Sequence, residues 1–104
     1  MPVDSSPTPH LDKPLIKAVA RAYSWREALE TGKAGSVNEL VRNSRYSRRY
    51  IRRLLPLAFL SPDITEAILG GTQPAHLKLA DLLDRHLPLS WEKQLKMVGV
   101  HKRQ

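Results

Sequence analysis

The sequence predicts an all-α protein, folded as a compact bundle of about six short helices. Apolar residues recur at helical spacing in several segments, and serine or aspartate precedes most of them, where its side chain can accept a bond from a free backbone amide. No segment of useful length has the alternating pattern of a β-strand. The 104 residues, 41% of them hydrophobic, are enough for one domain with a modest core.

The first helix is expected from Asp12, which can cap it, to about Thr31, since Gly32 and Gly35 follow. Its apolar stripe consists of Leu15, Ile16, Val19, Ala22 and Tyr23. Residues 1–11 are rich in proline and serine, which predicts a disordered lead or linker. The helical domain is therefore expected over residues 12–100, with a frayed tail at residues 101–104.

The next two helices have the pattern of a helix-turn-helix over about residues 36–56. Ser36 and Glu39 form a capping box, residues 43–46 read as a tight turn, and Ser47 can cap a helix that runs to about Leu55, before Pro56. Apolar residues fall where the two helices must hold each other, at Leu40, Val41, Tyr46, Ile51 and Leu54. Arg45 stands where glycine is common, and a positive φ there would cost about 1 kcal/mol.

The second half of the chain predicts three more helices. Residues 57–60 are apolar and should pack, and Ser61-Pro62-Asp63 is a strong helix start for a helix that ends at Gly70-Gly71. Two further helices are expected, over residues 76–85 and from Ser90 to Gly99. Trp25 and Trp91 are most simply packing residues of the core or of a domain edge.

The net charge of +7 is concentrated in one segment. Residues 42–53 contain six arginines and no acid. In the rest of the chain, 11 basic residues are nearly balanced by 10 acidic ones. Arginine can grip a phosphate or a guanine edge with two bonds, so the patch indicates a polyanionic partner. A basic helix face kept only for solubility is the alternative, but such a face would mix in acids.

The side chains that point outward from the helix starting at Ser47 are of the kind that binds phosphates and base edges in the major groove of duplex DNA. Arg48, Arg49 and Arg52 lie in its first turns and are expected to contact base edges. The remaining candidates are assigned to phosphates: Arg42, Arg45, Arg53, and Ser47 through backbone amides at the helix start. Tyr50 has two interpretations, a phosphate contact or packing against the neighbouring helix, whereas Tyr46 is expected in the core.

Other functional classes find little support in the sequence. The chain has no cysteine, and its four histidines are scattered without metal-ligand spacing, so we expect no metal, no cofactor, no small-molecule substrate and no enzymatic activity. Asp81 and Asp84 are interpreted as a solvated helix face. Residues 1–14 do not resemble a signal peptide, and no stretch approaches the roughly 18 apolar residues of a membrane span. A cytoplasmic, nucleoid-associated protein is expected.

Residues 25–91 resemble the C-terminal DNA-binding segment of large bacterial serine site-specific recombinases of the resolvase/invertase class. More distantly, residues 39–69 resemble the helix-turn-helix of ParB- and KorB-like partition proteins. The resemblance is carried by Trp25-Arg26-Glu27, Glu39-Leu40, residues 47–54, residues 57–60, Pro62-Asp63-Ile64, residues 66–69, Gln73-Pro74 and Leu87-Pro88-Leu89. It implies that the helix starting at Ser47 is the recognition helix and that the helices after Pro62 brace it.

The family carries its catalytic serine in an N-terminal domain, for which this sequence has no room, and Ser5 and Ser6 are not given that role. The chain is therefore expected to be part of a recombinase or a stand-alone relative, with duplex DNA and a catalytic domain or a second copy as partners. A transcriptional or partition regulator, a protein-interaction module built on the apolar residues 57–98, and RNA binding are the alternatives. Few aromatic residues lie on the basic face, which disfavours stacking on single strands.

Overall fold

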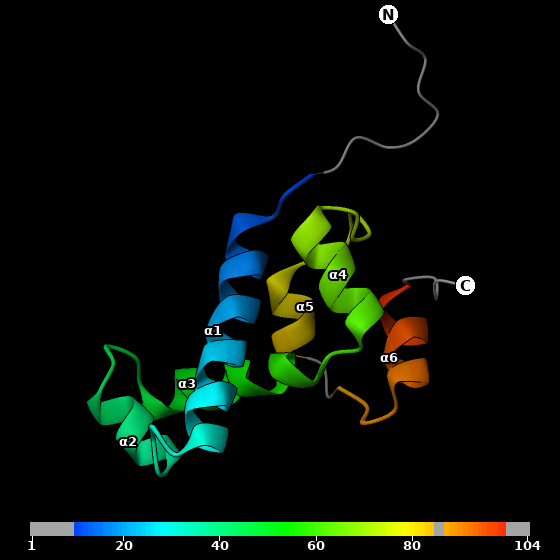
Figure 1. The fold of residues 1–104 in the computed structure, drawn as a ribbon. Helices are drawn as coiled ribbons and strands as arrows, with labels where there is room; N and C mark the ends of the chain where they lie inside the picture. Colours follow the sequence, from blue (N-terminus) through cyan, green and yellow to red (C-terminus); the bar gives the residue numbers. More distant parts are fainter. Residues whose placement is uncertain (1–9, 85–86, 100–104) are drawn as a thin grey trace, which may run out of the picture.

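A computed structural model of the chain describes residues 10–84 and 87–99, and these residues contain six α-helices, one 3₁₀ turn (η1) and no β-strand (Figure 1). The elements are α1 (Lys13–Thr31), α2 (Val37–Arg42), α3 (Arg48–Leu54), η1 (Leu55–Phe59), α4 (Pro62–Gly70), α5 (Leu79–Asp84) and α6 (Trp91–Val98). The prediction of a small all-α bundle is confirmed. None of the described helices has the length and apolar character that a membrane crossing needs.

The long helix α1 is the centre of the packing, in contact with α3, η1, α4 and α5. It begins where the Asp12 carboxylate accepts a bond of 3.1 Å from the Leu15 amide, and it ends at Gly32, which has a φ of 82°. Its buried face consists of Leu15, Ala18, Val19, Ala22 and Trp25. Tyr23, which we expected in this stripe, is 38% exposed because the buried face runs through Ala18 instead.

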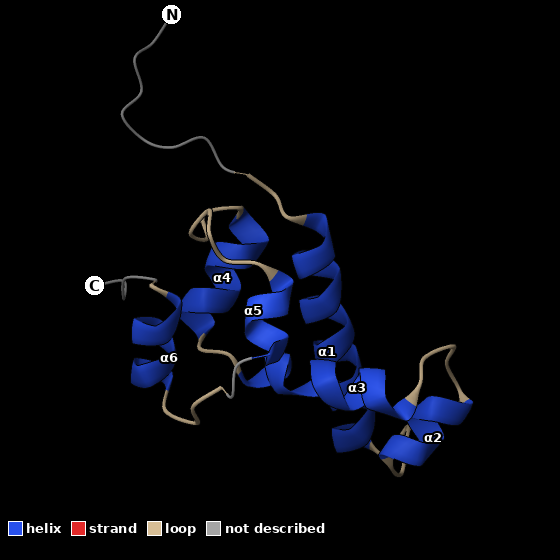
Figure 2. Cartoon of the chain, turned by 180° about the vertical axis from the view of Figure 1, so that it is seen from behind, coloured by secondary structure: helices blue, strands red, loops and turns tan. Residues whose placement is uncertain are grey.

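One hydrophobic cluster joins all the helices. Its fully buried members include Ile51 and Leu54 of α3 and Ile64 and Ile68 of α4. In both views α2 projects at one end of the bundle and α6 lies at the other, with α1, α4 and α5 between them (Figures 1 and 2). The segment with six arginines therefore lies at the α2–α3 end.

A buried glutamine fastens the opposite end of the bundle. Gln94 of α6 is 2% exposed, and its Oε1 accepts a bond of 2.7 Å from the amide of Ser61, the residue that caps α4. Its Nε2 donates to the carbonyls of Phe59, at 3.3 Å, and Pro88, at 2.7 Å. Through one buried and two partly buried hydrogen bonds, Gln94 holds α6 and the 87–90 loop against the start of α4.

The element predictions differ from the structure at two places. Helix α5 begins at Leu79 rather than at residue 76, because the Leu77 amide donates to the Pro74 carbonyl in a turn and Asp81 Oδ2 accepts from the Lys78 amide. Phe59 and Trp91 are not core residues, since they are 53% and 56% exposed, which leaves the domain edge for Trp91. The caps at Ser36, Ser47, Ser61 and Ser90 are confirmed.

The chain joins the fold two residues before the expected start of the domain. The His10 amide donates to the Gly71 carbonyl at 2.8 Å, and the Gln73 side chain donates to the His10 carbonyl at 3.2 Å. Residues 1–9 and 100–104, which include most of the expected lead and the whole expected tail, lie outside the described residues. Gly71 has a φ of 74°, and a Cβ atom there would lie 2.9 Å from the His10 nitrogen.

We predict that Gly71→Ala destabilises the fold more than Gly32→Ala does. Both glycines have a positive φ, which costs alanine about 1 kcal/mol, but a Cβ at Gly32 meets no atom within 4 Å. The clash with His10 at Gly71 should add about 1–3 kcal/mol. Urea unfolding of the two variants measures the difference, and equal free energies of unfolding would show that the His10 contact is not maintained in solution.

Candidate nucleic-acid interface

Two short-range hydrogen bonds fix the start of α2. Ser36 Oγ accepts from the Glu39 amide at 3.2 Å, and Glu39 Oε2 reaches back to accept from the Gly35 amide at 2.7 Å. These are the two reciprocal bonds of the predicted capping box, except that the Glu39 side chain accepts from the amide of Gly35 instead of that of Ser36. The Glu39 carboxylate therefore serves the start of the helix.

The connection between α2 and α3 consists of residues 43–47 and contains no left-handed residue. Ser44 Oγ accepts from the Tyr46 amide at 3.2 Å, which tightens the turn. Among the described residues only glycines have a positive φ, so Arg45 does not carry the strain that we considered for it. Ser47 Oγ accepts from the Tyr50 amide at 3.1 Å and starts α3.

An aromatic cluster attaches α3 and the turn before it to α1. Tyr46 and Tyr50 stack with ring centroids 4.8 Å apart, and Trp25 meets both edge-on, at 5.7 and 6.2 Å. Arg21 of α1 lies 4.9 Å from the centre of the Tyr46 ring and donates to the Tyr50 hydroxyl at 2.9 Å. Contacts of this kind are worth roughly 0.5–1.5 kcal/mol each beyond the area buried.

The buried residues of α3 determine where its arginines point. At about 100° per residue, Arg49 projects about 160° from Ile51 and about 140° from Leu54, both of which are completely buried. Arg52 and Arg53 lie on either side of Arg49, and Arg48 lies nearer the edge of this face. We call the exposed side chains of Arg48, Arg49, Arg52 and Arg53 the arginine face; an open surface recess is lined by these four residues alone.

Two members of the arginine face have partners within the protein. Arg48 donates to Asn38 Oδ1 of α2, and Arg53 forms an ion pair of 2.8 Å with Asp84 of α5. Within residues 10–84 and 87–99, no hydrogen bond or ion pair engages the side chains of the other arginines of the segment, Arg42, Arg45, Arg49 and Arg52. All six arginines are exposed, so their charges face solvent at the α2–α3 end.

The structure separates the remaining candidates of the sequence analysis. Tyr46 and Tyr50 are half-buried and pack against the core, which is one of the two alternatives considered for Tyr50. Trp25 is 8% exposed and belongs to the core, as expected. Sequence reasoning missed Arg21, Asn38 and Asp84, which reach the segment from other helices. Lys17 and Arg21 at i, i+4 were a local signal of a basic stripe on α1, but no spacing rule indicates Asn38 or Asp84.

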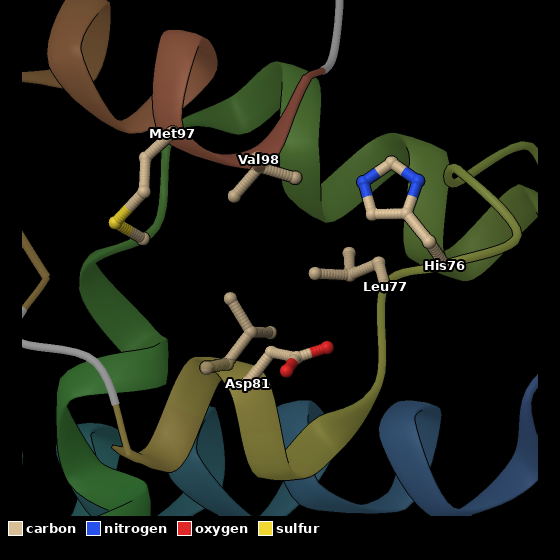
Figure 3. Close-up of a pocket in the computed structure, with 6 residues that line it drawn as sticks. His76, Leu77, Asp81, Met97 and Val98 are labelled. Carbon is tan, nitrogen blue, oxygen red and sulfur yellow. The ribbon is translucent and has the colours of Figure 1, made fainter.

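The described residues contain no group of three or more acids and histidines placed to hold a metal ion. A pocket between α6 and the start of α5 is lined by His76, Leu77, Asp81, Leu82, Met97 and Val98 (Figure 3). Its volume of about 20 Å³ is close to that of a single water site. Asp81, the one carboxylate there, accepts from the Lys78 amide at the start of α5.

Comparisons with protein-family models, with curated proteins and with solved structures find no match to the chain. The chemistry of its surface is therefore the basis on which a function can be proposed. The arginine face, set on a helix whose opposite side is completely buried, is the largest concentration of one kind of charge in the sequence.

We predict that Ile51→Ala lowers the free energy of unfolding by about 2–5 kcal/mol, the usual cost of emptying a buried aliphatic site. The matched control is Ile16→Ala in α1, because Ile16 is only partly buried and should lose less. Thermal or urea unfolding monitored by circular dichroism measures both variants. Equal losses would contradict the burial of Ile51 and with it the direction assigned to the arginine face.

Proposed function

We propose that the chain is a DNA-binding domain that reads duplex DNA, with α2, residues 43–47 and α3 acting as a helix-turn-helix. The observation that carries the proposal is the arginine face, which is exposed and points away from the buried side of α3. Planar guanidinium groups match the acceptor pairs of guanine in the major groove and the oxygens of phosphates. Binding of single strands needs exposed aromatic rings on which bases can stack, whereas Tyr46 and Tyr50 stack on each other and meet Trp25 edge-on.

Within this proposal the arginines divide into two roles. Arg48 and Arg49 in the first turn of α3 and Arg52 in its last turn are assigned to base edges. Arg49 and Arg52 have no partner among the described residues that a base would need to replace. Arg42, Arg45 and Arg53, at the margins, are assigned to phosphates. These contacts supply affinity without sequence information.

The resemblance of residues 25–91 to the DNA-binding segment of serine recombinases directs the proposal towards site-specific recombination. The chain would supply target recognition and no catalytic group, and a catalytic recombinase domain or a second copy would be its partner. Transcriptional or partition regulation uses the same kind of surface, and the symmetry of the bound site distinguishes these roles.

A protein-docking module is the second candidate, favoured by one observation. Phe59, Leu89 and Trp91 are 53%, 97% and 56% exposed. Gln94 bonds to the carbonyls of both Phe59 and Pro88, which brings the backbone of these segments together near α6. A docking module would bind through this end and leave the arginine face unused.

The two candidates are separated by in vitro selection from a random-sequence duplex pool. The wild-type chain should enrich a sequence motif, and the Arg48→Ala/Arg49→Ala/Arg52→Ala variant should not. The matched control, Lys78→Ala/Lys93→Ala/Lys96→Ala, removes three exposed cations elsewhere and should enrich the wild-type motif. Failure of the wild type to enrich any sequence would contradict the proposal and favour the docking module.

For the single variant Arg49→Ala, we predict a loss of about 1–3 kcal/mol in binding to the selected site and relaxed preference at one base pair. Arg49 points most directly away from the core, so this substitution should leave the melting temperature unchanged. Fluorescence anisotropy with the selected duplex and its single-base variants measures the effect. A uniform loss across all duplexes would reassign Arg49 to a phosphate.

A further inference from the structure

We propose that Asp84 is an intramolecular competitor for the DNA phosphate that Arg53 binds, and that it thereby weakens binding to DNA of any sequence. This inference rests on the proposed function, since it concerns the same arginine face. It adds a role for α5, a helix outside the proposed helix-turn-helix.

The geometry places one carboxylate against one margin of the arginine face. Arg53 Nη2 and Asp84 Oδ1 are 2.8 Å apart, and the two residues are separated by 31 positions in the sequence. Arg53 is in the last turn of α3 and Asp84 is the last residue of α5, and both helices pack on α1. A carboxylate and a phosphate present the same kind of oxygen acceptor to a guanidinium group, so Asp84 occupies a position that a phosphate oxygen would take.

The pair is accessible to exchange. The side chains of Arg53 and Asp84 are 44% and 68% exposed, and ion pairs this open to water contribute little to folding. A phosphate can therefore displace Asp84 at small cost to the fold. The displaced carboxylate remains beside the DNA backbone, where two negative charges repel each other.

The expected consequence is a limit on affinity that does not depend on sequence. Because Arg53 is assigned to a phosphate, the competition applies to every duplex equally. The ratio between the affinities for the correct site and for other DNA is unchanged, because the same penalty applies to both. Asp84 therefore limits the overall affinity for DNA without touching a base or a phosphate.

The experiment measures the dissociation constants of four variants for a random-sequence duplex of fixed length. Asp84→Asn should bind about two- to fivefold more tightly than the wild type, the range expected when one exposed ion pair is removed. Glu92→Gln is the matched control, because it makes the same charge change on an exposed residue of α6, at the other end of the bundle. Its affinity should increase less.

The third and fourth variants are Arg53→Gln and the double variant Arg53→Gln/Asp84→Asn. The gain from Asp84→Asn should vanish when Arg53 is absent, because the competition needs both groups. Equal gains for Asp84→Asn and Glu92→Gln would overturn the inference and leave only an effect of net charge. Weaker binding by Asp84→Asn would also overturn it, since Asp84 would then hold Arg53 in its binding position. Absence of duplex binding by the wild type would instead reject the proposed function.

Discussion

The arrangement of the proposed interface depends on the burial of one side of α3. Ile51 and Leu54 are completely buried, and the stacked rings of Tyr46 and Tyr50 fasten the same helix to Trp25 and Arg21 of α1. Because a short helix can present only one face to the core, this attachment fixes the direction of its arginines. A rotation of α3 by one residue would bury a guanidinium group without a partner, at a cost that packing does not offset.

The same attachment explains how so much like charge is tolerated on a helix of seven residues. Arg48 with Arg52, and Arg49 with Arg53, are i, i+4 pairs that each destabilise a helix by a few tenths of a kcal/mol. Burial of Ile51 and Leu54 contributes about 1.5–3 kcal/mol for each side chain and exceeds that repulsion. The repulsion decreases further when an anion neutralises the face, so the charge pattern is better suited to a bound polyanion than to the free protein.

Local signals were sufficient for most of the fold and for the position of the arginines. Each serine cap, the glycine ends of α1, α4 and α6, and the buried positions of α3 follow from interactions within a few residues, which a sequence displays directly. A local turn at Pro74 explains the late start of α5. Long-range contacts explain the other differences: Phe59 is exposed beneath the guanidinium of Arg26, and Asp84 meets Arg53 across 31 residues. No periodicity in the sequence indicates such pairs.

The central claim is that the α2–α3 end of the bundle contacts duplex DNA. Its most direct test is an NMR titration of the isotopically labelled chain with a short duplex, following backbone amide shifts and arginine side-chain resonances. The account predicts changes concentrated in residues 42–53 and in the arginine side chains, with Arg53 and Asp84 changing together. Shifts concentrated instead around Phe59, Leu89 and Trp91, or no shifts at all, would contradict it.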